Sequence, residues 1–405
     1  MNSRAGAKSR HLSAWLSLLL GVTLVLGPAG AAAETVDPWV YYYAGQDHFY
    51  NVEYDLALQD FRDALAGDPD NPFFYNSLAN TYLFQELYRL GQLEGNLYDA
   101  SNSFLKEKKP EPDSAQMAKV KEALARVRSI CEARLRKNPR DVDALYNLGI
   151  SYSTEGNYKF TIEKSWFDAL RAGSKANEFH RKVLAIDPNY HDAKLVPGVY
   201  DYVVGSIPGS VKWLAFLFGY SGSKYRGIRL MQETITKGKL LTSASAFLLA
   251  VVYTREKRHD YARTLFSSLQ DYYPRNPLLP LEIARSYTRE GKQKEALEQY
   301  VKVARDMEAG RPGYDKLPRE RLWYQIGVLY QQRGEWSQAL NAFAMITDRN
   351  DSDGLLKAHS GLRRGEIFLA QNRPDQARAE YQRVADLPYE ETRLEARQRL
   401  RTLSQ

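Results

Sequence analysis

Hydrophobic residues recur at helical spacing in short paired runs along most of the chain. A clear example is residues 242–274, where two such runs flank the charged residues 255–258. Their apolar positions are Ala246, Leu249, Ala250, Tyr253, Ala262, Phe266 and Leu269. Steps of three and four residues predict two amphipathic helices. The second helix should end at Pro274, because proline cannot continue a helix.

Large and small residues alternate between the two predicted helices. Ala250 and Ala262 let the helices approach, while Tyr253 and Phe266 fill the space toward the next hairpin. This pattern resembles the tetratricopeptide repeat, a helical hairpin of about 34 residues. One hairpin cannot bury its own apolar face, so the pattern predicts a stack of copies.

The same pattern elsewhere predicts about eight hairpins in an all-α, right-handed solenoid (superhelix). Residues 34–240 should hold irregular repeats with long helices, and residues 241–405 regular ones that end in a polar capping helix at 390–403. Within the irregular half, Asp113 or Ser114 should cap a long helix that reaches Lys137. Residues 157–186 predict one long helix or two end to end.

The first 33 residues have the composition of a secretory signal peptide. Positive residues precede the apolar stretch 12–27, and the alanines 31–33 offer a cleavage site. We therefore expect an exported protein, periplasmic or secreted after cleavage near Ala33; an uncleaved membrane anchor is the alternative. No other stretch of the sequence is long and apolar enough to cross a bilayer.

Charge and cysteine content add little. Removing residues 1–33 takes away three cations, which leaves 53 Lys and Arg against 49 Asp and Glu, a net charge of +4. So small a surplus does not indicate nucleic-acid binding. The single cysteine, Cys131, cannot form a disulfide within the chain, and its apolar neighbours predict a buried helix residue.

Residues 145 to about 274 resemble one family of repeat proteins more closely. The resemblance rests on the helix from Trp166 through Ala176 and His180 to Pro188, and on segments rich in proline, glycine and aromatic residues at 197–200, 205–208, 213–214 and 218–227. The family contains tetratricopeptide repeat protein 39 and the fungal inclusion-body-clearance protein, with exported bacterial relatives. Proline stands where the family usually has another residue before Gly198. The resemblance implies an all-helical adaptor, not an enzyme, and brings no catalytic residues.

Motifs for chemistry are largely missing from the sequence. It contains neither a phosphate-binding P-loop nor the HExxH zinc motif. Residues 348–359 resemble a calcium loop only at the start, because Asp353 and His359 replace its glycine and last glutamate. His180, His191 and Asp192 lack paired metal spacing, and we expect solvated or half-buried helix residues there. We expect no metal and no cofactor.

The first helix of each hairpin should line the concave face of the solenoid. Side chains next to the repeat tyrosine would point into it: Arg255, Arg285, Arg289, Gln331 and Arg363. Aligned arginines could hold a carboxylate or an extended acidic peptide. A solvated basic helix face is the alternative, and the sequence favours it.

The segment 205–220 has two interpretations. Trp213, Phe216 and Phe218 could form an exposed patch that docks on a membrane or a partner. They could instead form a core insertion, which a short segment with a single lysine favours. The sequence predicts an exported, non-enzymatic scaffold for a peptide or protein partner, and membrane docking through this segment is the alternative function.

Overall fold

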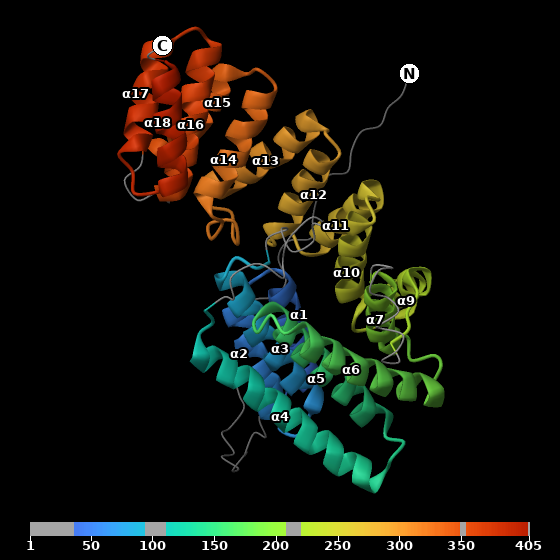
Figure 1. Cartoon of the computed structure of the whole chain (residues 1–405). Helices are drawn as coiled ribbons and strands as arrows, with labels where there is room; N and C mark the ends of the chain where they lie inside the picture. The colour runs from blue at the N-terminus through green and yellow to red at the C-terminus, as the bar shows by residue number, and fades with distance from the viewer. Residues whose placement is uncertain (1–35, 94–110, 208–219, 349–353, 404–405) are drawn as a thin grey trace, which may run out of the picture. The chain divides into compact units, whose positions relative to one another are not determined.

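The computed structural model describes residues 36–93, 111–207, 220–348 and 354–403, and these residues form helices joined by turns and loops. Residues 37–405 form one compact unit. Figure 1 shows the helices as successive hairpins, each beside the next. Within the described ranges there is no β-strand, and the predicted all-α solenoid is confirmed.

Eight hairpins and a final helix account for the described residues, which confirms the expected number. The first helices are α1 (Pro38–Tyr50), α3 (Pro72–Arg89), α5 (Val142–Thr161), α7 (Leu195–Gly205), α10 (Thr242–Arg255), α12 (Leu278–Arg289), α14 (Arg319–Gln332) and α16 (Gly354–Ala370). Their partners are α2 (Tyr54–Gly67), α4 (Ser114–Lys137), α6 (Trp166–Ile186), α9 (Lys224–Lys237), α11 (His259–Tyr272), α13 (Gln293–Glu308), α15 (Trp336–Thr347) and α17 (Pro374–Ala385). A 3₁₀ turn, η3 (His191–Lys194), precedes α7, and the predicted capping helix is α18 (Glu390–Thr402).

Local sequence sets the helix ends. The predicted long helix is α4, and its cap is Asp113, whose carboxylate accepts hydrogen bonds from the backbone N–H groups of Ala115 and Gln116. Between the two helices of seven hairpins one described residue adopts the left-handed conformation: Val52, Gly91, Lys164, Lys257, Gly291, Gly334 and Asn372. This conformation ends the first helix and reverses the chain. Val52 is unusual there, because β-branched residues rarely adopt positive φ.

Glycines on the first helices receive rings from the second helices, as the large and small pattern predicts. A Cβ on Gly45 would lie 2.6 Å from the ring of Phe61, and one on Gly327 would lie 2.6 Å from the ring of Phe343. In the third hairpin His180 takes the place of that aromatic ring, 2.7 Å from a Cβ on Gly149. His180 is fully buried, so the expectation of a solvated or half-buried residue is wrong.

The third hairpin also corrects the prediction for residues 157–186. The helix α5 continues through Asn157 to Thr161, the chain reverses at residues 162–165, and α6 then runs back along α5. The region therefore contains the end of one helix and an antiparallel second helix. Both helices are longer than in the regular hairpins, which is why the spacing of apolar residues in 157–186 did not show where one helix ends and the next begins.

The glycines behind the family resemblance bring α7 and α9 into backbone contact. A Cβ on Gly227 would lie 2.5 Å from the carbonyl oxygen of Gly198 and 2.7 Å from the backbone nitrogen of Tyr202. A Cβ on Gly222 would lie 2.7 Å from the carbonyl oxygen of Asp201. Only glycine fits at such distances, so this hairpin is held by close backbone packing.

Asp192 joins the irregular hairpins to the regular ones. Its carboxylate is buried and accepts hydrogen bonds of 3.0–3.1 Å from the backbone N–H groups of Lys239, Leu240 and Leu241. These groups precede α10 and have no partner within the helix, and the negative charge also suits the helix N-terminus. The expectation that Asp192 is solvated or half-buried is therefore wrong as well.

Candidate partner-binding surfaces

Two of the predicted binding residues, Arg285 and Arg289, lie on α12 around one carboxylate. Glu282 is almost fully buried, and its Oε1 accepts a hydrogen bond of 2.6 Å from Arg285. The guanidinium of Arg289 lies 4.0 Å from the other oxygen. The two arginine side chains remain 22% and 25% exposed, so a partner can reach them. We call these three residues the α12 cluster (Glu282, Arg285, Arg289), in which two guanidinium groups lie against one carboxylate.

A second cluster connects two first helices, α14 and α16, with the capping helix α18. Glu366 on α16 accepts hydrogen bonds from Gln331 on α14, Arg363 on α16 and Arg399 on α18, at 3.2, 3.3 and 3.2 Å. Burial alone would lower the pKa of Arg363, but a hydrogen bond to Tyr324 and the charge of Glu366 outweigh it, so its pKa is raised. This Glu366 cluster contains the other two predicted residues, Gln331 and Arg363.

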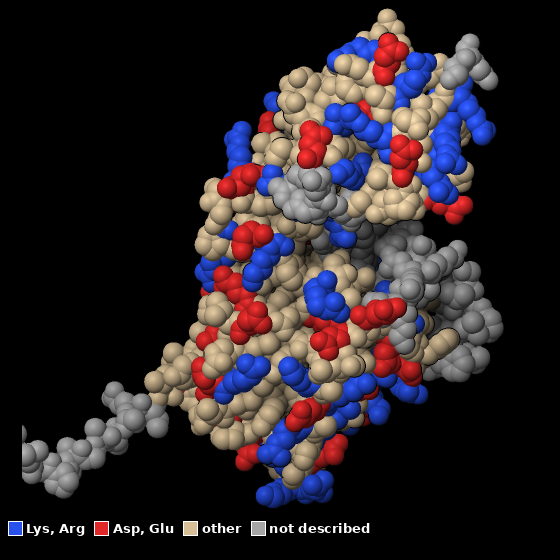
Figure 2. Space-filling view, turned by 90° about the vertical axis from the view of Figure 1, so that its left-hand side faces the viewer, with Lys and Arg blue, Asp and Glu red and all other residues tan. Residues whose placement is uncertain are grey.

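Arg255 stands apart from both clusters. It is an exposed residue at the end of α10, and its charge acts on Tyr202 and Glu256. The structure therefore groups four of the five predicted residues into two clusters. It shows no large surface of one sign on the face in Figure 2, where positive and negative side chains are interspersed.

The carboxylates Glu282 and Glu366 and the cation Arg399 escaped the sequence reasoning. Glu282 precedes Arg285 by three residues, and Glu366 follows Arg363 by three, which is the spacing of neighbours on a helix surface. That signal is present in the sequence. The arrival of Arg399 from the capping helix is not, because it depends on how α18 packs against α16.

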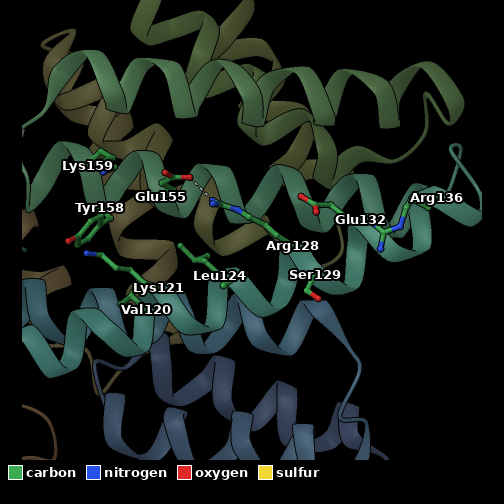
Figure 3. A pocket seen from close by; sticks show the side chains of 11 residues that line it. Val120, Lys121, Leu124, Arg128, Ser129, Glu132, Arg136, Glu155, Tyr158 and Lys159 are labelled. Atoms are coloured by element: carbon green, nitrogen blue, oxygen red, sulfur yellow. Dashed lines mark hydrogen bonds and ion pairs between the residues drawn. The ribbon is translucent and has the colours of Figure 1, made fainter.

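A groove between α4 and α5 has a volume of about 540 Å³. In Figure 3 the side chains of Lys121, Arg128 and Arg136 extend from α4, and Glu155, Tyr158 and Lys159 from α5. Arg128 pairs with Glu155 at 2.5 Å and lies over the ring of Tyr152. The groove is polar along its rim, and most of its cations already have partners.

Most of the positive side chains in this groove lie against a carboxylate or an aromatic ring. Lys159 pairs with Glu163 at 2.8 Å, and Lys121 lies 5.5 Å from the centre of the Tyr158 ring. Burial, followed by the negative charge of Glu163, raises the pKa of Tyr158.

Two buried titratable residues, His180 and Cys131, keep their neutral forms. Burial lowers the pKa of His180 to about 3, so its ring is neutral, and it stacks on Tyr146 with centroids 5.2 Å apart. Burial raises the pKa of Cys131 to about 12, which keeps the thiol protonated; the prediction of a buried cysteine is confirmed. His180 on α6 packs against Gly149 of α5, and Cys131 on α4 packs in a small core with Ala144 and Leu148 of α5.

The sequence also contains a calcium-like stretch and a segment that could dock on a membrane. Among the described residues no group of three or more His, Cys, Asp or Glu side chains is placed to hold a metal ion. Of the calcium-like stretch, residues 349–353 lie outside the described ranges. So do Trp213, Phe216 and Phe218, the proposed patch of segment 205–220. In the part of the chain that the structure describes, no helix combines the length and apolar character needed to cross a bilayer.

Comparison with known proteins places these surfaces in a repeat protein. Residues 192–361 match the family model described as Iml2/Tetratricopeptide repeat protein 39, and residues 360–388 match a tetratricopeptide repeat. The comparison with curated proteins found no match.

Solved structures with a similar arrangement include yeast Tom70, with 16% identity over 91% of this chain and 89% of that one, and a TM-score of 0.34. A tetratricopeptide-repeat protein of Thermus thermophilus, TTC0263, has 15% identity over 62% of this chain and 99% of that one, also with a TM-score of 0.34. The human IFIT1 dimer with PPP-AAAA has 13% identity over 92% and 82%, with a TM-score of 0.35. Such low scores support no argument about function.

Proposed function

This chain is a tetratricopeptide-repeat protein that resembles the Iml2/tetratricopeptide repeat protein 39 family over residues 192–361, and we propose that it is an exported, non-enzymatic scaffold. Proteins built from such repeats act as protein-interaction scaffolds. We propose that the partner is a peptide or protein segment rich in carboxylates, bound along the first helices of the C-terminal hairpins.

The α12 cluster is the observation that carries this proposal. Its two arginines lie against a buried carboxylate, and their side chains are 22% and 25% exposed. A guanidinium whose orientation is already fixed loses less entropy when it binds a carboxylate. The Glu366 cluster offers the same arrangement on α14, α16 and α18, so an extended segment could be held at two points.

Export is proposed from the sequence of residues 1–33 alone. Positive residues, an apolar stretch and a run of alanines support it. Cell fractionation with N-terminal sequencing of the mature protein tests this part. A mature chain that still begins at Met1 in the cytoplasmic fraction would refute it.

Binding can be tested with a fluorescent peptide of roughly ten residues that alternates glutamate and alanine, by fluorescence anisotropy. We expect Arg285→Gln with Arg289→Gln to weaken binding by about tenfold, since a hydrogen bond between charged groups contributes about 1.5–3 kcal/mol. Glu282→Gln should also weaken binding, because the buried carboxylate no longer holds the two guanidinium groups in place.

The matched control is Lys294→Gln with Lys302→Gln. Both lysines are exposed on α13, the second helix of the same hairpin, and the change in charge is identical. This control should bind as the wild type does. Equal affinity of all variants would refute the proposed surface. Unchanged or tighter binding in Glu282→Gln would contradict the role of this carboxylate in orienting the two arginines.

A further inference from the structure

The first hairpin touches a turn more than two hundred residues away in the sequence. The guanidinium of Arg275, between α11 and α12, donates to Glu53 at 2.9 and 3.0 Å and to Asp47 at 2.7 Å. The backbone N–H of Arg275 donates to the side-chain oxygen of Asn51 at 3.0 Å, across a separation of 224 residues. Asn276 donates to the carbonyl oxygen of Tyr50 at 2.6 Å. We call these contacts the 47–53/275 clasp.

The clasp depends mainly on charge and hydrogen bonds. Its main apolar element is the stack of Tyr50 on Tyr273, with ring centroids 4.9 Å apart. The side chains of Asp47 and Arg275 are 47% and 36% exposed, so water and ions reach the ion pairs. A cavity of about 180 Å³ remains beside the clasp, lined in part by Val52, Glu53 and Gly313.

The two sides of the clasp belong to different hydrophobic cores. The buried residues of the first core run from Tyr42 to Ala193, and those of the second from Leu195 to Ile283. Leu241, next to the carboxylate of Asp192, is partly buried against both. The joint around Asp192 is therefore one tie between the two parts of the stack, and the clasp is a second tie.

The turn that carries Arg275 is held firmly on its own side. Gly313 adopts a positive φ of 85°, and a side chain there would overlap the carbonyl oxygen of Arg275. Tyr314 and Leu317 of the same loop are buried, and Arg311 donates to the carbonyl oxygen of Pro274 at 3.1 Å. Any opening should therefore separate the first hairpin from an intact turn.

Negative charge surrounds Arg275 on the first hairpin. Asp47, Glu53 and Asp60 are all acidic, and His48 pairs with Asp60 at 2.6 Å and lies 4.0 Å from Glu53. Arg275 is the cation that the opposite turn supplies to this group.

We infer that the 47–53/275 clasp is a releasable closure of the repeat stack, which opens when salt screens its ion pairs. Opening lets the first three hairpins move about the joint at Asp192 while every hairpin stays folded. Exposed charge pairs are screened within about 10 Å at 0.1 M salt and about 3 Å at 1 M, so the balance shifts in this range. This opening would change how easily a partner reaches the surface formed by the first helices of the hairpins.

Spin labels on Gln59→Cys and Asp271→Cys in the full chain measure the distance across the clasp by double electron–electron resonance. Both positions are exposed, and the native Cys131 is buried and unreactive. We expect one narrow distance for the wild type at about 0.05 M salt, and a second, longer population at about 1 M. Arg275→Gln should show the longer population at low salt, with the ratio of closed to open molecules reduced roughly tenfold.

The matched control is Arg333→Gln. Arg333 has a similar exposure of 31% and pairs at 2.6 Å with Glu335 in its own hairpin turn. It should keep the narrow distance at low salt, and circular dichroism should show unchanged helix content in both variants. The inference is overturned if Arg275→Gln keeps the narrow distance at both salt concentrations, or if that variant loses helix content as it opens. It is also overturned if chains that carry only one label each give a distance signal, because the label pairs would then lie on two different chains and the clasp would join two copies.

Discussion

Replacement of Gly227 by alanine tests whether backbone contact holds α7 against α9. The new Cβ would lie 2.5 Å from the carbonyl oxygen of Gly198 and 2.7 Å from the backbone nitrogen of Tyr202. Ordinary van der Waals contact begins at 3.4 Å, so the helices must separate by roughly 0.9 Å. Because both obstacles are backbone atoms, neither can rotate out of the way.

The magnitude follows from two opposing effects. Overpacking costs about 1–3 kcal/mol, and the rigid obstacles put this site at the upper end, about 3 kcal/mol. Alanine gains about 1 kcal/mol over glycine in a helix interior. The net loss of stability is therefore about 2 kcal/mol, confined to the α7–α9 hairpin.

Hydrogen exchange followed by mass spectrometry measures this loss locally, which suits a repeat stack whose unfolding is not a single step. Amides of α7 and α9 should exchange about 30-fold faster, since each 1.4 kcal/mol is a factor of ten. Gly173→Ala is the control, because Gly173 lies inside α6 and a Cβ there meets nothing within 4 Å. It should slow exchange in α6. Equal or slower exchange of α7 and α9 in Gly227→Ala would refute the reasoning.

Two further predictions concern buried polar side chains. Asp192→Ala should cost about 3 kcal/mol, because the N–H groups of residues 239–241 lose their acceptor; faster hydrogen exchange at the start of α10 would report it, and unchanged exchange would contradict it. Burial lowers the pKa of His180 to about 3 from 6.5, so the unfolded chain binds a proton between these values that the folded chain does not. The free energy of unfolding, measured by urea denaturation, should therefore fall as the pH falls from about 6.5 toward 3. The slope of this free energy against pH should be smaller for His180→Phe. Equal slopes would show that His180 does not titrate as described.

The sequence predicted the repeat architecture because helical hairpins are local structures. Spacing of apolar residues, a capping aspartate at 113 and the alternation of alanine with aromatic rings all act within one hairpin or between neighbours. These features gave α4, the C-terminal hairpins and the capping helix α18. They also placed Arg285 and Arg289 on one helix surface, since residues four apart share a face.

Sequence reasoning failed where one side chain replaced another of different chemistry. His180 fills the position of the repeat phenylalanine, and a histidine reads as polar until the glycine opposite it is known. Tyr314 and Leu317 are buried although they lie in the loop between α13 and α14, where no helical spacing marks them as core residues. The segment that carries Trp213 lies outside the described residues, so its two interpretations stay as predictions.

The amino-acid sequence specifies the kind of repeat unit and the order of the units along the chain. Which distant groups meet depends on how the units stack in space. Asp192 reaches the N–H groups before α10, Arg399 reaches Glu366, and Arg275 reaches the first hairpin. The physical reason is range: helix periodicity and capping depend on neighbours a few residues apart, whereas these contacts depend on small rotations that accumulate from hairpin to hairpin along the stack.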